Sequence, residues 1–238
     1  MSLIACVGCG GLFPKTGGPT HRYMESSPGC WACFGEVLAR EYSDLQYLKV
    51  HRLTVDAYAI QHPGQLSPQC IRSVALHAIS LCAIIEKGVE MNRATEVIQR
   101  AAINKERFEW LVPPSSMGAL TVADVHPAEN AQEHARLVRL WAESAWSAWS
   151  DHHPTIRKWL SGIWDAYQHG KKRAPKSPFA AYGVFPFSIC PDQQSTLHLY
   201  FPIVRPVDGS GEKGLSYGRE RSYPSFNEQH QEGDPGRL

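Results

Sequence analysis

Four cysteines near the N-terminus have the spacing of a metal site. Cys6 and Cys9 are separated by two residues, and Cys30 and Cys33 repeat that spacing after an interval of twenty residues. Two Cys-x2-Cys pairs at this separation are typical of four-thiolate zinc sites, because each tight turn places two sulfurs on one edge of a tetrahedron. We therefore expect Cys6, Cys9, Cys30 and Cys33 to bind Zn²⁺ in a structural site.

Other ligand sets and other roles are compatible with the same residues. His21 lies between the two cysteine pairs and is the alternative fourth ligand beside Cys6, Cys9 and Cys30. If no metal binds, Cys30 and Cys33 are small apolar residues of a helix. A redox role for the first pair is disfavoured, because the pair lies before any predicted strand–helix unit. The Gly- and Pro-rich interval between the pairs has little else to hold it, and this favours a structural zinc.

Histidines on the predicted helices form a second candidate site. The possible ligands are His51, His62, His77 and His153. Histidines that project inward from facing helices can bind a divalent metal in the core of a bundle. Tyr58 or Asp56 would then act as a general acid or base, or would orient a ligand. The alternative is that each histidine is a core residue whose ring nitrogens bond to carbonyls or carboxylates.

Charge and composition exclude several classes of protein. The 238 residues include 24 Lys and Arg against 23 Asp and Glu, so the net charge is +1, far from that of a strongly electrostatic nucleic-acid binder. No run of residues approaches the roughly 18 apolar residues of a membrane-spanning helix. Only five residues, none of them basic, precede Cys6, so no export signal is expected. We expect a cytoplasmic protein whose cysteines are ligands or free thiols.

The apolar periodicity of residues 1–165 predicts an all-α, bundle-like domain. The expected helices span roughly 29–42, 44–61, 68–85, 93–109, 127–150 and 154–167. The Gly- and Pro-rich residues 6–29 are expected to form no regular structure and to be held by zinc. Trp141 and Trp149 fall on the buried stripe of their helix, which favours core packing over a stacking platform.

Two domains are expected, with a boundary near residue 165. Residues 1–165 are the zinc-binding helical domain, and residues 166–238 are a Pro- and Gly-rich extension that we expect to be largely irregular. The extension starts with the linker-like segment 171–178 and ends with the polar, aperiodic segment 209–238. Between them, residues 195–204 alternate in polarity and predict a single edge strand.

Several longer strings resemble an uncharacterised bacterial family of domains of unknown function. The most specific are GPTHRYM, SPGCW and VDAYAIQHPG, and the strings CVGCGG, LTVADV and AWSDHHPTIRKW extend the likeness over about residues 4–160. The resemblance implies that certain residues occupy the family's motif positions. These are Cys6, Cys9, His21, Cys30, His51, Asp56, His62 and one of His152 and His153. The family has no assigned activity, and residues beyond about 165 look foreign to it.

These patterns together predict a zinc-binding helical protein. Because the strongest motif is of the structural type, with no open coordination position, we expect an interaction or regulatory module for a protein partner or a small molecule. The alternative is a metal-dependent enzyme that uses the histidine site in the bundle, with thiol transferases as an analogy of fold only. Neither a membrane nor a nucleic acid is expected as a partner.

Overall fold

The structure is a computed structural model that describes residues 2–103 and 108–169. The chain divides into two compact units, residues 1–188 and 189–238, and all of the described residues belong to the first. The expected edge strand at 195–204 and nearly all of the irregular extension lie outside the described residues. Residues 166–169 are described, and they belong to the last helix of the first unit.

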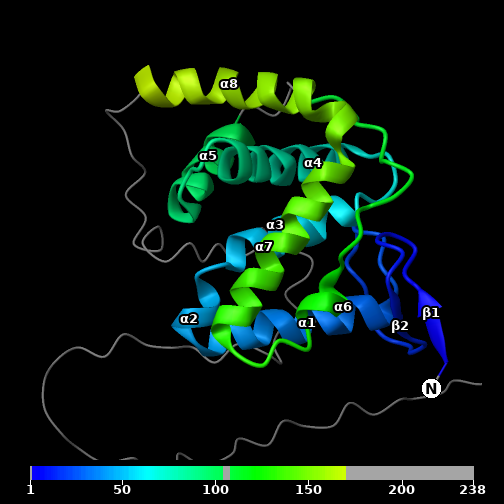
Figure 1. Ribbon diagram of the computed structural model, residues 1–238. Coiled ribbons are helices and arrows are strands. Elements are labelled where there is room, and N and C mark those ends of the chain that lie inside the picture. Colours follow the sequence, from blue (N-terminus) through cyan, green and yellow to red (C-terminus); the bar gives the residue numbers. More distant parts are fainter. Residues whose placement is uncertain (1, 104–107, 170–238) are drawn as a thin grey trace, which may run out of the picture. The chain divides into compact units, whose positions relative to one another are not determined.

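The described residues form one small hairpin and a set of helices (Figure 1). The strands are β1 (Leu3–Ala5) and β2 (Leu12–Pro14), which pair antiparallel. The helices are α1 (Pro28–Ser43), α2 (Leu45–Leu48), α3 (His51–Gln61), α4 (Pro68–Leu81), α5 (Met91–Ile103), α6 (Val122–Val125), α7 (Ala131–Ala148) and α8 (His153–His169). A π-helical turn (Cys82–Glu86) continues α4, and a 3₁₀ turn (Ser150–His152) precedes α8. The prediction of an all-α, bundle-like domain is confirmed.

Side-chain caps explain where the longer helices begin. Ser27 and Ser67 cap α1 and α4, each followed by a proline, and each hydroxyl accepts the backbone N–H three residues on. Asn130 caps α7 by accepting the N–H of Glu133. The long helix expected from residue 127 therefore begins at 131. Local side-chain chemistry thus fixes these boundaries.

The segment expected to be one helix over 44–61 is two helices. Asp44 caps the short helix α2 by accepting the N–H of Gln46, at 2.8 Å. The chain then leaves the helical conformation at Val50, with φ −107° and ψ 1°, and restarts as α3. The break makes His51 the first residue of α3, which still carries Asp56 and Tyr58 as the sequence pattern predicts.

The expectation of no regular structure over residues 6–29 is wrong for β2. Phe13 is buried between the exposed residues Leu12 and Pro14, so the strand packs one face on the protein. Gly10, with φ +74°, reverses the chain between the strands. The N–H of Gly10 then donates to the carbonyl of Cys6 at 2.9 Å. The glycines that argued against regular structure are the residues that close this hairpin.

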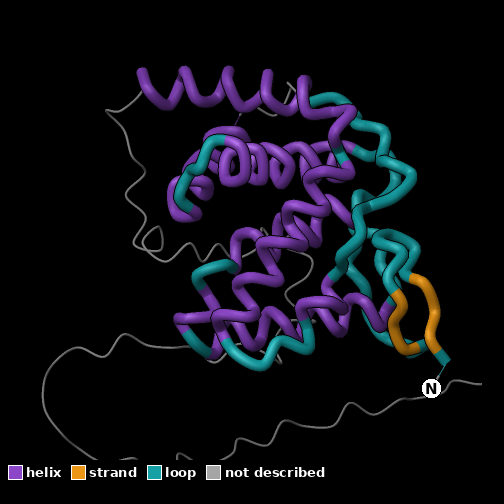
Figure 2. The backbone as a smooth tube through the Cα atoms, in the orientation of Figure 1, coloured by secondary structure: helices purple, strands orange, loops and turns teal. Residues whose placement is uncertain are grey.

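The helix α3 lies at the centre of the core. All of its residues from Leu53 to Gln61 are buried, and the helix packs against α4 and α7. Figure 2 shows α3 surrounded by other helices, with the two strands at one end of the described chain. One consequence is that a polar side chain between Leu53 and Gln61 is buried and needs a hydrogen-bond partner inside the protein.

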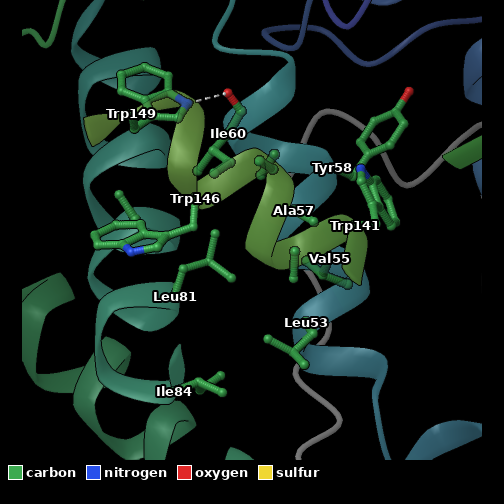
Figure 3. Packing of buried hydrophobic residues seen from close by; sticks show 14 of the residues in the cluster. Leu53, Val55, Ala57, Tyr58, Ile60, Leu81, Ile84, Trp141, Trp146 and Trp149 are labelled. Carbon is green, nitrogen blue, oxygen red and sulfur yellow. Dashed lines mark hydrogen bonds between the residues drawn. The ribbon is translucent and has the colours of Figure 1, made fainter. Parts of the chain in front are cut away.

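The tryptophans of α7 fill the core, as the sequence predicts (Figure 3). Trp141 and Trp149 are buried, and their indole N–H groups donate to α3: Trp141 to the Gln61 side chain at 2.8 Å, and Trp149 to the carbonyl of Ile60 at 3.2 Å. Trp146 is buried beside them. These contacts place α7 along α3 and account for the tryptophans as packing residues.

One described segment, Pro68–Glu86, is long and apolar enough to cross a membrane. It comprises α4 and the π-helical turn, and 56% of its most apolar window is buried inside the fold. Such burial is typical of a core helix in a soluble protein. The segment packs against α3 and α5.

Candidate metal centre

Four potential metal ligands converge between the hairpin and two helices. They are Cys6, Cys9, Cys30 and His62, all buried, and their ligand atoms all lie within 4.8 Å of one another. Cys6 and Cys9 come from the turn between β1 and β2, Cys30 from the first turn of α1, and His62 from the C-terminal end of α3. Within the described residues, this is the one such group of histidine, cysteine or carboxylate ligands.

The distances in this Cys3His cluster match those of a tetrahedral ion. The Cys9 and Cys30 sulfurs are 3.9 Å apart. The Nε2 of His62 is 3.5 Å from the Cys6 sulfur and 3.4 Å from the Cys30 sulfur. A tetrahedron with Zn–S bonds of about 2.3 Å and a Zn–N bond of about 2.0 Å has S–S edges of about 3.8 Å and S–N edges of about 3.5 Å. The donor set and its spacing therefore fit one small divalent cation.

Neighbouring groups orient the ligands of the Cys3His cluster. The Nδ1–H of His62 donates to the carbonyl of Tyr58 at 2.7 Å, which leaves the lone pair of Nε2 facing the sulfurs. The backbone N–H of Ser27 donates to the Cys6 sulfur at 3.3 Å. The hydroxyl of Tyr58 lies 3.6 Å from the Cys30 sulfur, and its ring stacks on the His62 ring at 4.0 Å. The site is thus prepared by backbone and ring contacts as well as by its ligands.

The electrostatics of the three thiols also favour a cation. The pKa of Cys6 is held far below its usual range, because its sulfur accepts hydrogen bonds from Cys30 and Cys9. The bond with Cys30 favours the thiolate of Cys9, but Cys6 and burial outweigh it and raise the pKa of Cys9 to about 12. The pKa of Cys30 is raised further by its bonds to Cys6 and Cys9. The protein alone stabilises one thiolate here, and a divalent ion would compensate the charge of the others.

Glycines allow the hairpin to approach the end of α3. A methyl group on Gly8 would lie 2.4 Å from Cδ2 of His62 and 2.3 Å from the carbonyl oxygen of Glu25. One on Gly29, in the first turn of α1, would lie 2.4 Å from the carbonyl oxygen of Pro14. Only glycine fits at either position. The Gly-rich composition near the cysteines is therefore a requirement of close packing around the ligands.

Cys33 and His21, the two expected fourth ligands, lie elsewhere. The sulfur of Cys33 is directed at the carbonyl of Val122, at 4.0 Å, and burial raises the pKa of this thiol to about 11. Because α1 begins at Pro28, Cys33 stands one helical turn beyond Cys30 and about 60° around the helix. The ring of His21 packs against Tyr23 and Trp31. The structure brings His62 to the fourth position instead.

The four histidines expected to form a second metal site are not brought together. His62 joins the cysteines, while His51 bonds to Glu41 at 2.7 Å and His77 bonds to Asp56 at 2.7 Å. The ring of His153 stacks on Trp146 at 3.8 Å, and its Nε2 lies 3.0 Å from the carbonyl of that residue. This expectation is corrected: each histidine has a separate partner, because a shared helix stripe does not specify which neighbouring helix it meets.

Sequence reasoning missed a buried cluster around Glu41. This fully buried carboxylate accepts hydrogen bonds from Thr54 at 2.5 Å, His51 at 2.7 Å and His134 at 2.9 Å. Burial opposes ionisation, but the bonds from His134 and His51 outweigh it, so the pKa of Glu41 is lowered. The signal was present in the sequence, since Glu41 continues the apolar stripe of α1 through Phe34.

A second buried carboxylate, Asp56, binds two basic side chains. Arg52 donates through Nε at 2.9 Å and through Nη2, while the Nδ1 of His77 donates at 2.7 Å. Burial disfavours the charge on Asp56, but Arg52 and His77 outweigh it and lower its pKa. Arg52 precedes Asp56 by four residues on α3, a spacing typical of helical ion pairs.

Comparison with known proteins identifies the family. The sequence model of a family of unknown function, DUF5946, matches residues 4–150. The chain belongs to this family. In this DUF5946 protein, the match covers the hairpin except for Leu3, and all of α1 to α7, and it includes the Cys3His cluster. No curated protein and no solved structure matches the chain.

Proposed function

We propose that Cys6, Cys9, Cys30 and His62 bind one Zn²⁺ ion and that this zinc is structural. The observation that carries the proposal is the buried convergence of three sulfurs and one imidazole nitrogen at tetrahedral spacing. Thiolate and imidazole donors are the ligands that Zn²⁺ prefers in closed structural sites. Four protein ligands fill the coordination sphere, which leaves no open position for a substrate.

We propose further that the protein is an interaction or regulatory module of the cytoplasm rather than a zinc enzyme. The hairpin that the metal would hold presents Leu3, Val7 and Leu12 to solvent, with exposed fractions of 57%, 70% and 62%. Apolar side chains that are kept exposed on a small fixed hairpin suit contact with a protein partner. The net charge of +1 supports neither a nucleic acid nor a membrane as that partner.

Metal content tests the zinc proposal. The protein, purified without added metal, is analysed by plasma mass spectrometry beside the double variant Cys6→Ser/Cys9→Ser. We expect one zinc per chain in the wild type and none in the double variant. Cys70→Ser is a matched control, because the thiol of Cys70 bonds to the carbonyl of Tyr23 and lies outside the cluster. An absence of zinc in the wild type, or full zinc in the double variant, would contradict the proposal.

A further inference from the structure

The two buried carboxylates hold their histidines in different ways. In the Glu41 cluster, His134 is fully buried and the Nε2 of His51 bonds to the hydroxyl of Tyr42 at 3.0 Å. In the Asp56 cluster, the carboxylate is fully buried, but the side chains of Arg52 and His77 each remain 15% exposed. Both clusters reach the surface, since the His51 side chain is 13% exposed, but the outward nitrogen of His51 is bonded to Tyr42, a residue of the protein itself.

Two nitrogen atoms of the Asp56 cluster have no hydrogen-bond partner among the described residues. Arg52 uses Nε and Nη2 on the carboxylate, and His77 uses Nδ1. Among residues 2–103 and 108–169, no group bonds to Nη1 of Arg52 or to Nε2 of His77. Because both side chains are fixed by the same carboxylate, their remaining nitrogens are held in place before any ligand arrives.

Stability alone is a weak reason for this arrangement. A buried ion pair pays for most of its Coulomb attraction with desolvation, and apolar residues of similar size stabilise a core as well or better. What the buried Asp56 does supply is orientation: it fixes the guanidinium plane of Arg52 and the direction of the His77 ring. An oriented guanidinium is well suited to planar anions such as carboxylates and phosphates.

The loop that carries His21 lies over this part of α4. The thiol of Cys70 donates to the carbonyl of Tyr23 at 3.3 Å, and Cys70 precedes His77 by seven residues, on the same face of α4. Burial, together with the charge of His77, lowers the pKa of His21 to about 4, so His21 is a neutral ring within electrostatic range of His77. An aromatic, partly desolvated surround strengthens charged hydrogen bonds.

We propose that Arg52, Asp56 and His77 form a binding site for a small anionic molecule that carries a carboxylate or phosphate group. Nη1 of Arg52 donates to the anion, and so does Nε2 of protonated His77. Asp56 does not touch the ligand and acts as a positioning residue. The loop between Cys9 and Cys30 brings His21 close to the site, where its ring packs against Tyr23 of the same loop and Trp31 of α1. The proposal goes beyond the structural zinc and does not depend on which metal is bound.

Titration of the full chain, as purified, with inorganic phosphate and separately with acetate tests the proposal. Ionic strength is kept constant with chloride, and binding is followed through the ring signals of the histidines in NMR spectra. We expect saturable shifts at His77 with at least one of the two anions, and no comparable shifts at His51 or His134. The anion that binds more tightly distinguishes a phosphate from a carboxylate ligand. Absence of saturable shifts at His77 with both anions would overturn the proposal.

A pair of matched variants separates binding from folding. In His77→Asn the amide nitrogen can replace Nδ1 as the donor to Asp56, while the group that replaces Nε2 is lost. We expect this variant to bind the anion about tenfold more weakly or worse, since a charged hydrogen bond is removed. His51→Asn makes the same change in the Glu41 cluster, and we expect affinity within about twofold of the wild type. Equal weakening in both variants would overturn the assignment to His77. Zinc content, measured on the same samples, reports on the metal proposal separately.

Discussion

The N-terminal segment, residues 2–27, and the helical body, residues 28–103 and 108–169, are held in place by different means. The segment contains two strands of three residues each, and few of its hydrophobic side chains are buried: Cys6, Cys9, Phe13 and Met24. The body has a continuous core around α3, with side-chain caps at α1, α4 and α7 and with two tryptophans whose indole N–H groups donate to α3. Two of the segment's four buried apolar residues are ligands of the Cys3His cluster. The comparison teaches that the segment depends on the cluster, whereas the body depends on burial.

Metal removal should have the largest effect of the changes considered, and it should affect the N-terminal segment far more than the helical body. Treatment with a strong chelator should release residues 2–27 and leave most helices of the body formed, because coordination replaces a core only in the segment. Amide hydrogen exchange, measured with and without chelator, gives the result by segment. We expect loss of protection in β1 and β2 and in the first turn of α1, with little change in α7. A uniform loss across the chain, or no change in the hairpin, would contradict this account.

A substitution in the Glu41 cluster tests whether the stability of the helical body depends on its buried groups. Glu41→Gln removes a buried charge that three side chains stabilise, and we expect a loss of about 3 kcal/mol in the free energy of unfolding at pH 7. Because the folded-state pKa of Glu41 is lowered, its contribution is present above the unfolded value of about 4.3 and is lost as the pH falls through the lower folded value. Chemical denaturation at several pH values measures the free energy of unfolding and its dependence on pH.

The variant should therefore lose stability less steeply than the wild type as the pH falls below about 4.3. Glu36→Gln is the matched control, since Glu36 is 66% exposed and also bonds to a histidine, His126. We expect a change of less than about 0.5 kcal/mol there. Equal losses in the two variants would show that burial of Glu41 is not what matters.

A substitution at Gly8 tests whether close packing of the hairpin on His62 supports the N-terminal segment and its metal site. A methyl group at this position would strike the ring of His62, so we expect Gly8→Ala to cost about 2 kcal/mol and to weaken metal binding. Thermal unfolding and competition with a zinc chelator measure the two effects. Gly35→Ala is the control, because Gly35 is exposed in α1 with nothing within 4 Å of the added carbon, and this variant should be neutral or slightly more stable. Unchanged zinc affinity in Gly8→Ala would contradict the packing argument.

The smallest expected effect is at Cys33. Because its sulfur faces Val122 and stands outside the Cys3His cluster, Cys33→Ser should keep one zinc per chain and lose less than about 1 kcal/mol. Metal analysis and denaturation check both values. Loss of zinc in this variant would show that Cys33 is a metal ligand like Cys30 and would contradict its placement outside the cluster.

Local patterns in the sequence predict the helices and three members of the cluster. Cys6 and Cys9 meet within one turn, and Cys30 follows the Ser-Pro signal that starts α1, so short-range geometry brings the three forward as candidates. The same signal does not exclude Cys33, because residues three apart on a helix are neighbours on its surface. Packing of the Cys33 sulfur against Val122 decides between the two cysteines.

His62 could not be assigned in this way. It is separated from Cys6 by 56 positions, and it reaches the cluster only because the hairpin packs on the C-terminal end of α3. The histidine stripe of α3 was visible, but the neighbour that each histidine meets depends on how the helices pack. The same holds for Glu41 and His134, which are 93 positions apart. These contacts depend on long-range packing, which the periodicity of a single sequence does not predict.

The identity of the four ligands is the central claim, and X-ray absorption at the zinc edge of the metal-loaded wild type tests it most directly. Cys6, Cys9, Cys30 and His62 predict three sulfur neighbours at about 2.3 Å and one nitrogen neighbour at about 2.0 Å. The same spectrum is expected from Cys33→Ser. A shell of four sulfurs in the wild type that falls to three in Cys33→Ser would contradict the account and would restore the four-thiolate site.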